Sequence, residues 1–292
     1  MSPACNSIPR RVTTGARRFS RISRNSDMLR PRITPCLLVH QGGLVKTVEF
    51  RDAKYVGDPI NAVKIFNEKE ADELVVLDID ATVNGAEPDY GMIAHLAAEC
   101  RMPLCYGGGV RTPEQARKII GLGVEKVAVS AAAVEDATLL TRMAEAVGRQ
   151  SVVAVLDVRK KSGLFAKGYE VVTRNATQVH KQDPFELARQ LQAAGAGEIV
   201  INSVDRDGQM KGYDLSLAVK MRQTLQVPLT FLGGAGSHQD IEALFQACGV
   251  VGASAGSLFV FKGPYRAVLI NYPHPAQREG IYHAGLATHS TK

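Results

Sequence analysis

Eight short aliphatic runs recur along the chain from residue 32 onward. They are continuous rather than alternating with polar residues, which is typical of strands covered on both faces. The runs cover residues 33–39, 73–79, 102–106, 125–130, 151–158, 197–204, 227–232 and 249–255. This pattern predicts eight buried strands of a parallel sheet.

Amphipathic segments with helix-start signals separate these runs. Asp58-Pro59 and Asp183-Pro184 each combine an N-cap residue with a proline at the first helical position, and residues 112–115 form a capping-box pattern. Helices are predicted near residues 59–70, 89–100, 113–122, 135–147, 184–195, 215–225 and 238–247. Alternating strands and helices over about 250 residues indicate an α/β fold, the (β/α)8 TIM barrel, with a doubly wound open sheet as the alternative.

A twofold internal repeat favours the barrel. The segment DELVVLDIDATVNG (72–85) is similar to GEIVINSVDRDGQ (197–209), and YGGGV (106–110) is similar to LGGAG (232–236) at nearly the same shift. Duplication of a half-barrel explains both similarities. A doubly wound open sheet would not explain why the glycine-rich turns after the strands recur in both halves of the sequence.

The formal net charge of +6 is concentrated at the start of the chain. Residues 1–27 contain six arginines and one acidic residue, so the remainder carries a net charge of only +1. The body therefore gives no electrostatic reason to bind nucleic acid. Residues 1–27 are predicted to be a disordered basic tail or to precede a natural start at Met28, although their composition also suits an organellar transit peptide.

Hydropathy and cysteine spacing exclude further classes. No apolar run is long enough to cross a bilayer. The five cysteines include no CxxC pair, so neither a disulfide framework nor a zinc site is predicted, and no other metal or cofactor is expected. A reducing, cytoplasmic location follows. We expect the barrel to occupy residues 28–270 and residues 271–292 to form a flexible tail.

The predicted strand ends carry candidate anion sites, because chemistry in such barrels lies at the C-terminal ends of the strands. Gly233 and Gly234 follow the seventh strand, and Gly256 and Ser257 follow the eighth, which is the usual phosphate site of the fold. The repeat predicts a second, weaker site with Gly108 and Ser130. In this site Ala131 occupies the position at which the other half has Ser257. The alternative is that these glycines only close tight turns.

Three carboxylates, Asp78, Asp157 and Asp207, lie at or just beyond strand ends. When the fifth strand is overlaid on the first, Asp157 falls on Leu38. The repeat therefore predicts an acid at position 38, where a leucine that cannot exchange a proton is found. His40 is interpreted as a solvated loop histidine rather than its replacement.

Four charged residues stand directly before strands, at the opposite end of the predicted barrel. Their charges sum to zero, so inward-pointing side chains could form a neutral ring of ion pairs that acts as a plug or a gate. The alternative is ordinary solvated charge. These residues are Arg32, Glu73, Lys126 and Glu198.

Over residues 28–265 the chain resembles the HisF family, the cyclase subunit of imidazole glycerol phosphate synthase. The resemblance rests on RITPCLL, GLVKT, GDPI, SVVAVLDVRK and, most specifically, NSVDRDGQMKGYD. It implies a heterodimer in which a glutaminase docks on the N-terminal face of the barrel and releases ammonia through it. It also implies a reaction of ammonia with the two-phosphate substrate PRFAR, giving imidazole glycerol phosphate and AICAR in histidine biosynthesis.

The resemblance assigns roles to individual residues. Asp157 matches the second of two catalytic aspartates, Leu38 replaces the first, Lys46 matches a loop lysine, and Asp207 matches an aspartate that lines the site. The four charged residues match a family ring that gates the ammonia entrance. Ser130-Ala131 replaces an Asn-Thr pair of the first phosphate site.

The missing acid leaves an alternative open. PCLL and GLVKT also resemble a divergent glycosyl-amidation (WbuZ-type) branch, which implies an ammonia relay to a sugar amidotransferase that modifies a nucleotide-linked sugar for surface polysaccharide, the O-antigen of lipopolysaccharide. An isomerase of the related HisA type would need both acids and no gate. A scaffold without small-molecule chemistry would not need the anion site after strands 7 and 8.

Overall fold

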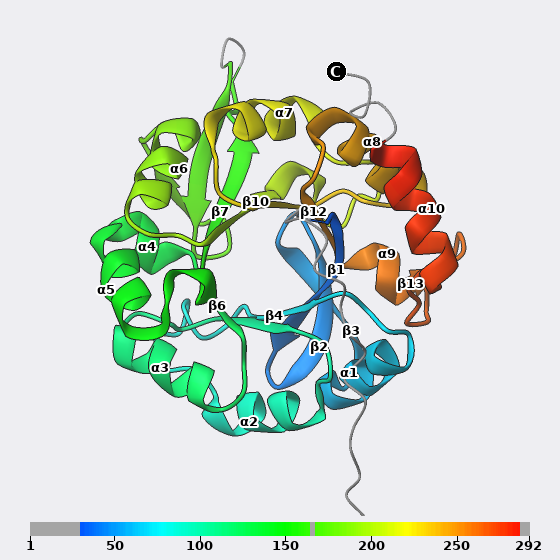
Figure 1. Ribbon diagram of the computed structural model, residues 1–292, viewed down its shortest axis with the longest axis horizontal. Coiled ribbons are helices and arrows are strands. Elements are labelled where there is room, and N and C mark those ends of the chain that lie inside the picture. Colours follow the sequence, from blue (N-terminus) through cyan, green and yellow to red (C-terminus); the bar gives the residue numbers. More distant parts are fainter. Residues whose placement is uncertain (1–29, 164–166, 287–292) are drawn as a thin grey trace, which may run out of the picture.

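The computed structural model describes residues 30–163 and 167–286, and its centre is a closed barrel of eight parallel strands (Figure 1). Each barrel strand pairs with the next along the chain, β12 pairs with β1, and β7 pairs with β10 to complete the circle. The predicted (β/α)8 barrel is confirmed and the open sheet is excluded. The barrel strands are β1 (Arg32–His40), β4 (Leu74–Asp78), β5 (Leu104–Gly107), β6 (Lys126–Val129), β7 (Val152–Lys160), β10 (Glu198–Ser203), β11 (Leu229–Leu232) and β12 (Gly252–Ala255).

Helices surround the barrel, and the predicted starts of three of them are confirmed. The carboxylates of Asp58 and Asp183 accept hydrogen bonds from backbone amides of the first helical turn, and Thr112 and Gln115 form the capping box. The helices are α1 (Pro59–Glu68), α2 (Tyr90–Glu99), α3 (Pro113–Gly121), α4 (Ala131–Glu135), α5 (Thr138–Val147), α6 (Pro184–Ala193), α7 (Leu215–Thr224), α8 (His238–Cys248), α9 (Ser257–Val260) and α10 (Pro275–Leu286).

Two antiparallel hairpins extend the barrel and were not predicted. β1 and β7, the strands related by the repeat, are both nine residues long, and each continues into a hairpin at its C-terminal end. β3 is exposed over most of its length, and β2, β8 and β9 contain at most two consecutive aliphatic residues, so none shows the long apolar run that marked the barrel strands. The additional strands are β2 (Gly43–Val48), β3 (Arg51–Gly57), β8 (Tyr169–Thr173) and β9 (Gln178–His180), with a short pair β13 (Phe261–Lys262) and β14 (Ala267–Val268) near the C-terminus.

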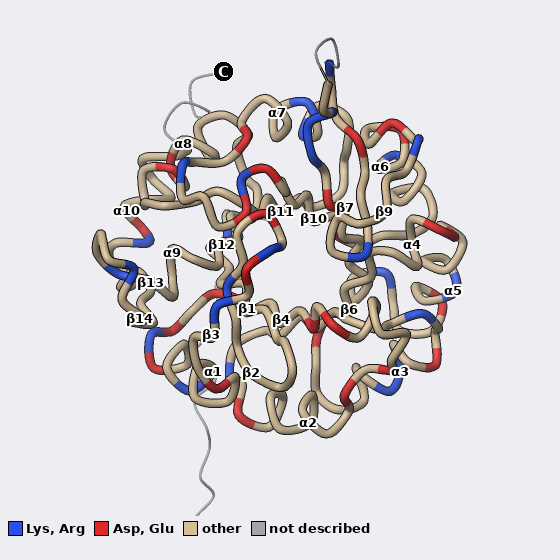
Figure 2. Tube along the Cα trace, turned by 180° about the vertical axis from the view of Figure 1, so that it is seen from behind, with Lys and Arg blue, Asp and Glu red and all other residues tan. Residues whose placement is uncertain are grey.

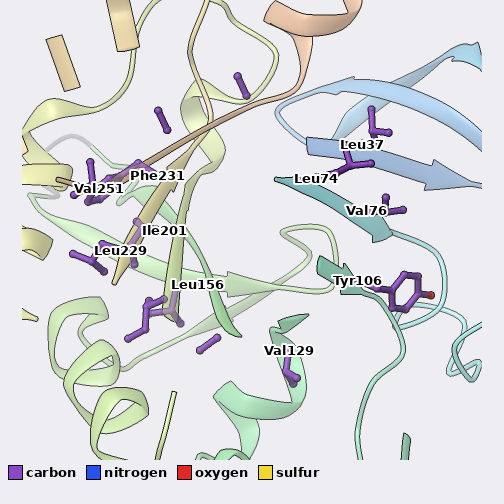
Figure 3. Packing of buried hydrophobic residues seen from close by; sticks show 14 of the residues in the cluster. Leu37, Leu74, Val76, Tyr106, Val129, Leu156, Ile201, Leu229, Phe231 and Val251 are labelled. Atoms are coloured by element: carbon purple, nitrogen blue, oxygen red, sulfur yellow. The ribbon is translucent and has the colours of Figure 1, made fainter. Parts of the chain in front are cut away.

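The core has two layers. The larger one lies between strands and helices and includes Leu37, Tyr106 and Ile201, whose side chains point away from the barrel axis (Figure 3). The smaller one fills the barrel interior with short side chains such as Cys36 and Ala128. Continuous apolar runs supply both layers, because successive strand residues point to opposite faces.

The C-terminal segment corrects one prediction. Residues 275–286 form α10, which packs on α8, with Ile281 buried and the Tyr282 ring 6.0 Å from the Phe245 ring. The predicted flexible tail over 271–292 is therefore wrong as far as residue 286, and the barrel domain extends past residue 270. One aliphatic residue, Ile281, makes these contacts together with Tyr282 and Gly285, so α10 lacks the regular aliphatic spacing that predicts helices. Residues 1–27 and 287–292 lie outside the described ranges.

Charged residues of both signs are interspersed around the outer helices (Figure 2). This distribution agrees with the near-neutral body predicted from the sequence. None of the helices in the described ranges is long and apolar enough to cross a membrane.

Candidate active site

A cavity opens at the C-terminal ends of the barrel strands. It brings together the three side chains predicted to be catalytic, Lys46, Asp157 and Asp207, although 161 positions separate Lys46 from Asp207 in the sequence. Leu38 also lines it. Closure of the barrel produces this convergence, because all eight strands end at the same rim.

Asp157 lies on the inward face of β7, at the residue where pairing with the hairpin strand β8 begins. One of its carboxylate oxygens accepts a hydrogen bond of 2.9 Å from the side-chain amide of Asn202, which is opposite in the β7–β10 register. Burial raises the pKa of Asp157 to about 6, and the hydrogen bond from Asn202 offsets only part of this effect. A carboxyl group with a pKa near neutrality can both accept and donate a proton at physiological pH.

The β2–β3 hairpin supplies Lys46 and holds Asp207. The Lys46 ammonium is buried and donates a 2.6 Å hydrogen bond to the carbonyl oxygen of Cys36, and burial lowers its pKa despite the nearby Asp207. The Asp207 carboxylate accepts hydrogen bonds from the Thr47 hydroxyl at 2.8 Å and the Phe50 amide at 3.4 Å. Burial raises the pKa of Asp207 above its ordinary value.

The opposite side of the cavity is apolar where the repeat predicts an acid. Leu38 pairs with Leu77 in the β1–β4 register, and both side chains line the cavity. His40, two residues beyond Leu38, does not line it. Its Nδ1 lies 2.7 Å from a carboxylate oxygen of Asp80, so the histidine is partly exposed but also fixed by a partner that the sequence interpretation missed.

Glycines after β11 and β12 form a small recess beside this cavity. Gly233, Gly234, Gly256 and Ser257 line it, and Gly256 and Ser257 belong to both spaces. A Cβ at Gly234 would meet the Gly212 carbonyl oxygen at 2.2 Å, so the backbone approaches too closely for any side chain. The predicted residues of the second-half anion site are therefore brought together, with amides and the Ser257 hydroxyl available to an anion.

Gly256 also has a role that spacing did not predict. A Cβ at this position would lie 2.5 Å from the Lys46 ammonium nitrogen. The glycine thus leaves room for the buried lysine to reach the Cys36 carbonyl.

The predicted first-half site lies at the other end of the same cavity. Gly108 and Ser130 both line it, together with Ala131 and Arg111. A Cβ at Gly108 would meet the Asp78 carbonyl oxygen at 2.5 Å, so this turn also requires glycine. The Asp78 carboxylate itself accepts hydrogen bonds from the amides of the following turn and shapes it.

At the opposite end of the barrel the four predicted charges form a closed ring. Arg32 pairs with Glu73 at 3.5 Å and with Glu198 at 2.7 Å, and Lys126 pairs with the same carboxylates at 2.5 and 2.8 Å. Burial lowers the pKa of Lys126 and raises that of Glu198. The paired charges outweigh burial in both, so the Lys126 pKa lies above and the Glu198 pKa below its ordinary value.

Several residues of the site were not found from the sequence. Asn202 interrupts an aliphatic strand with a buried amide, which is the signal that could have identified it. Thr47 carried no such signal, because only the hairpin fold brings it to Asp207. Arg174 and Asn175, in the β8–β9 turn, also line the cavity.

Comparison with known proteins gives consistent results. The family described as "Histidine biosynthesis protein" matches residues 32–265. A relative from Vibrio vulnificus, provisionally named imidazole glycerol phosphate synthase subunit hisF3, is 56% identical over 252 residues, 86% of this chain and 96% of the relative. A Leptospira interrogans protein with the provisional name of subunit HisF of the same synthase is 53% identical and covers 88% of this chain and 100% of its own length. The HisF subunit of Saccharolobus solfataricus is 36% identical over 80% of this chain and 91% of its own length.

Proposed function

Because the chain belongs to the histidine biosynthesis protein family, we propose that it is the HisF-type cyclase subunit of a glutamine-dependent imidazole glycerol phosphate synthase. In this role it uses ammonia to convert PRFAR to imidazole glycerol phosphate and AICAR, a lyase-type reaction of histidine biosynthesis. One observation carries the proposal. The carboxyl group of Asp157, which accepts a hydrogen bond from Asn202, lies in a cavity with a glycine-lined anion site at each end.

The cavity suits a ligand with two phosphates. In the proposed complex one phosphate lies against Gly234 and Ser257, and the other against Gly108 and Ser130. The reacting centre then lies between them, beside Asp157. Ammonia adds through its lone pair to an electrophilic carbon of the substrate, which makes the bonded nitrogen acidic. With its pKa raised to about 6, Asp157 takes a proton from that nitrogen and delivers it to the group that leaves.

Ammonia reaches this centre from a glutaminase subunit docked on the N-terminal face, in a heterodimer. The ring of Arg32, Glu73, Lys126 and Glu198 closes the barrel at that face, and its four ion pairs support the assignment as a gate. Exchange of partners within the ring opens a path into the barrel interior.

The cysteines of the described ranges are all free thiols, which supports the proposed cytoplasmic location.

A second candidate function follows from Leu38. A barrel with a complete charge ring and only one of two acids fits an ammonia relay, which passes ammonia to an amidotransferase acting on a nucleotide-linked sugar. The apolar Leu38–Leu77 side of the cavity is the observation that favours it.

Turnover of PRFAR with ammonium salts, followed by loss of substrate absorbance, tests the proposal. The full chain should turn over slowly and Leu38→Asp faster, because general acid–base help contributes about 10²–10⁴-fold. Leu38→Asn, which places a polar side chain of nearly the same size at that position without a group that exchanges a proton, is the matched control and should not gain activity. Tight PRFAR binding without turnover in the native chain or in Leu38→Asp would overturn the cyclase and favour the relay.

A further inference from the structure

The β8–β9 turn, residues 174–177, forms part of the wall at the first-half end of the cavity. Arg174 and Asn175 line the cavity there, together with Gly108, Ala131 and Glu135. The side-chain amide of Asn175 donates a 3.2 Å hydrogen bond to the carbonyl oxygen of Ile79, beyond the end of β4. The turn therefore reaches from the β7 side of the barrel to the β4 side.

This turn has an unusual backbone. Arg174, Asn175 and Ala176 have φ angles of 53°, 55° and 61°, the left-handed region that costs most non-glycine residues about 1–2 kcal/mol each. The amide and the hydroxyl of Thr177 both donate to the Arg174 carbonyl oxygen and hold this conformation. Such strained backbone is concentrated at ligand-binding sites. Here the turn places the Arg174 guanidinium at the cavity.

The guanidinium is only weakly held. One of its nitrogens pairs with Glu135 at 3.3 Å, and both side chains are nearly half exposed, a setting in which an ion pair contributes about 0–1 kcal/mol. By contrast, Arg111 donates to two carbonyl oxygens at 2.7 and 2.8 Å, and the buried Lys46 donates to one. Arg174 is therefore the cation among those lining the described cavity that can change partner at least cost.

The first-half anion site has use for such a cation. Ala131 supplies no hydroxyl where the other half has Ser257, and Glu135 would repel an anion if Arg174 did not neutralise it. A guanidinium can bind a phosphate through two parallel hydrogen bonds. In the pair with Glu135 only one nitrogen of Arg174 bonds to the carboxylate, so a phosphate is the stronger partner.

We propose that Arg174 binds a phosphate monoester at the first-half end of the cavity by leaving Glu135, so that the β8–β9 turn acts as a charged clamp on that end of the ligand. The inference rests on the proposed function in one respect, that the ligand carries a phosphate at this end. Glu135 competes with the ligand for Arg174, and it therefore lowers the affinity and favours release.

Calorimetric titration of the full chain with PRFAR tests the clamp through two opposite effects. Arg174→Met should raise Kd by about tenfold or more, because hydrogen bonds between charged groups typically contribute 1.5–3 kcal/mol. Glu135→Gln should lower Kd by roughly two- to threefold, because the competing pair contributes at most about 1 kcal/mol. In the double variant Kd should stay well above that of the native chain, because Glu135→Gln relieves repulsion but does not replace the lost guanidinium.

Arg142→Met is the matched control. Arg142 is on α5 and pairs at 2.9 Å with Asp136, which lies just before that helix. It is about half exposed and does not line the cavity. Its Kd should equal that of the native chain. Equal affinities for Arg174→Met and the native chain, or a double variant that binds as tightly as the native chain, would overturn the clamp.

Ser257→Ala separates the clamp from the proposed function. If Ser257→Ala weakens PRFAR binding and Arg174→Met does not, the clamp alone fails. If the native chain does not bind PRFAR, the cyclase fails, and titration with inorganic phosphate decides the clamp. Loss of phosphate binding in Arg174→Met would support it, and unchanged binding would overturn it.

Discussion

At the scale of single residues, surroundings rather than residue type decide which carboxyl groups can do chemistry. Asp58 and Asp157 are both aspartates after or near strand ends, yet the first caps a helix at the surface and the second lies largely enclosed beside Asn202 in the cavity. Burial raises the pKa of Asp157 to about 6. Leu38 shows the converse, because the fold provides the position for an acid and the residue there cannot exchange a proton.

The raised pKa of Asp157 predicts a pH-dependent stability cost. Its pKa is higher in the folded chain than in the unfolded chain, so its favourable contribution is complete only below about pH 4 and is lost as the pH rises through 6. Asp157→Asn removes the charged form and should increase the free energy of unfolding by about 1.5 kcal/mol at pH 5 and about 3 kcal/mol at pH 8. Urea denaturation at both pH values measures this difference.

The control for this trend is Asp52→Asn, on the exposed strand β3. Its unfolding free energy should not diverge from that of the native chain with rising pH. If the difference in unfolding free energy between Asp157→Asn and the native chain were the same at both pH values, the raised pKa of Asp157 would be contradicted. In turnover assays the pH profile of kcat/KM should bend near 6 in the native chain.

At the scale of elements, the two barrel strands related by the repeat carry the parts that complete the site. The hairpin after β1 supplies Lys46 and holds Asp207, and the hairpin after β7 supplies Arg174. Neither hairpin has the apolar pattern of a buried strand. The elements that serve the site are thus hard to recognise from hydropathy, because their buried positions hold polar residues such as Lys46 and Thr47 beside short aliphatic pairs.

Helix α10 gives a stability prediction at this scale. Ile281→Ala removes a buried side chain from the contact with α8 and should reduce the free energy of unfolding by about 2–4 kcal/mol. Leu269→Ala, at a half-exposed position just before the helix, should change it by less than about 0.5 kcal/mol. Chemical denaturation compares the two. Equal midpoints would show that residues 275–286 do not belong to the cooperative unit.

At the scale of the whole molecule, the barrel separates two polar centres at its opposite ends. The charge ring closes the N-terminal end, the cavity with Asp157 and Asp207 opens at the C-terminal end, and short side chains such as Cys36 and Ala128 fill the interior between them. Under the proposed function, ammonia made on one side is used on the other. The two ends can therefore be perturbed separately.

Lys126→Met should separate them. It leaves Glu73 and Glu198 with Arg32 as their remaining partner in the ring, and loss of one partner of a buried ion pair costs about 3–5 kcal/mol, so folding is checked by thermal melting. In the complex reconstituted with a glutaminase, the glutamine-dependent rate should fall by more than about tenfold. The ammonium-dependent rate should stay within about twofold.

A matched control is Lys64→Met, in a surface pair with Glu99 on the outer helices. Both of its rates should equal those of the native complex. Parallel loss of both rates in a well-folded Lys126→Met would show that the ring is a structural plug and not a gate.

The sequence by itself determined the architecture of this protein. Continuous apolar runs, capped helices and a twofold repeat suffice for the barrel, because burial on both faces and helix capping are properties of nearby residues. The positions before and after strands also identified the ring and the cavity residues Asp157, Asp207, Gly234 and Ser257. In a parallel barrel all strands begin at one end and finish at the other, so a residue's place along its strand predicts the end of the barrel at which it lies.

Only the tertiary structure decided the partners of those residues. The contact of Asn202 with Asp157, of Thr47 with Asp207 and of Arg174 with Glu135 joins segments whose separation carries no periodic signal. Helix α10 and the segment before it are a further example, since Tyr282 contacts α8 and Tyr272 contacts β1 only in the folded chain. The hydropathy pattern predicts which side chains are buried. Which residues then become neighbours depends on how the strands, helices and hairpins pack in the closed barrel. Those neighbours raise the pKa of Asp157 and leave Arg174 in only one weak ion pair.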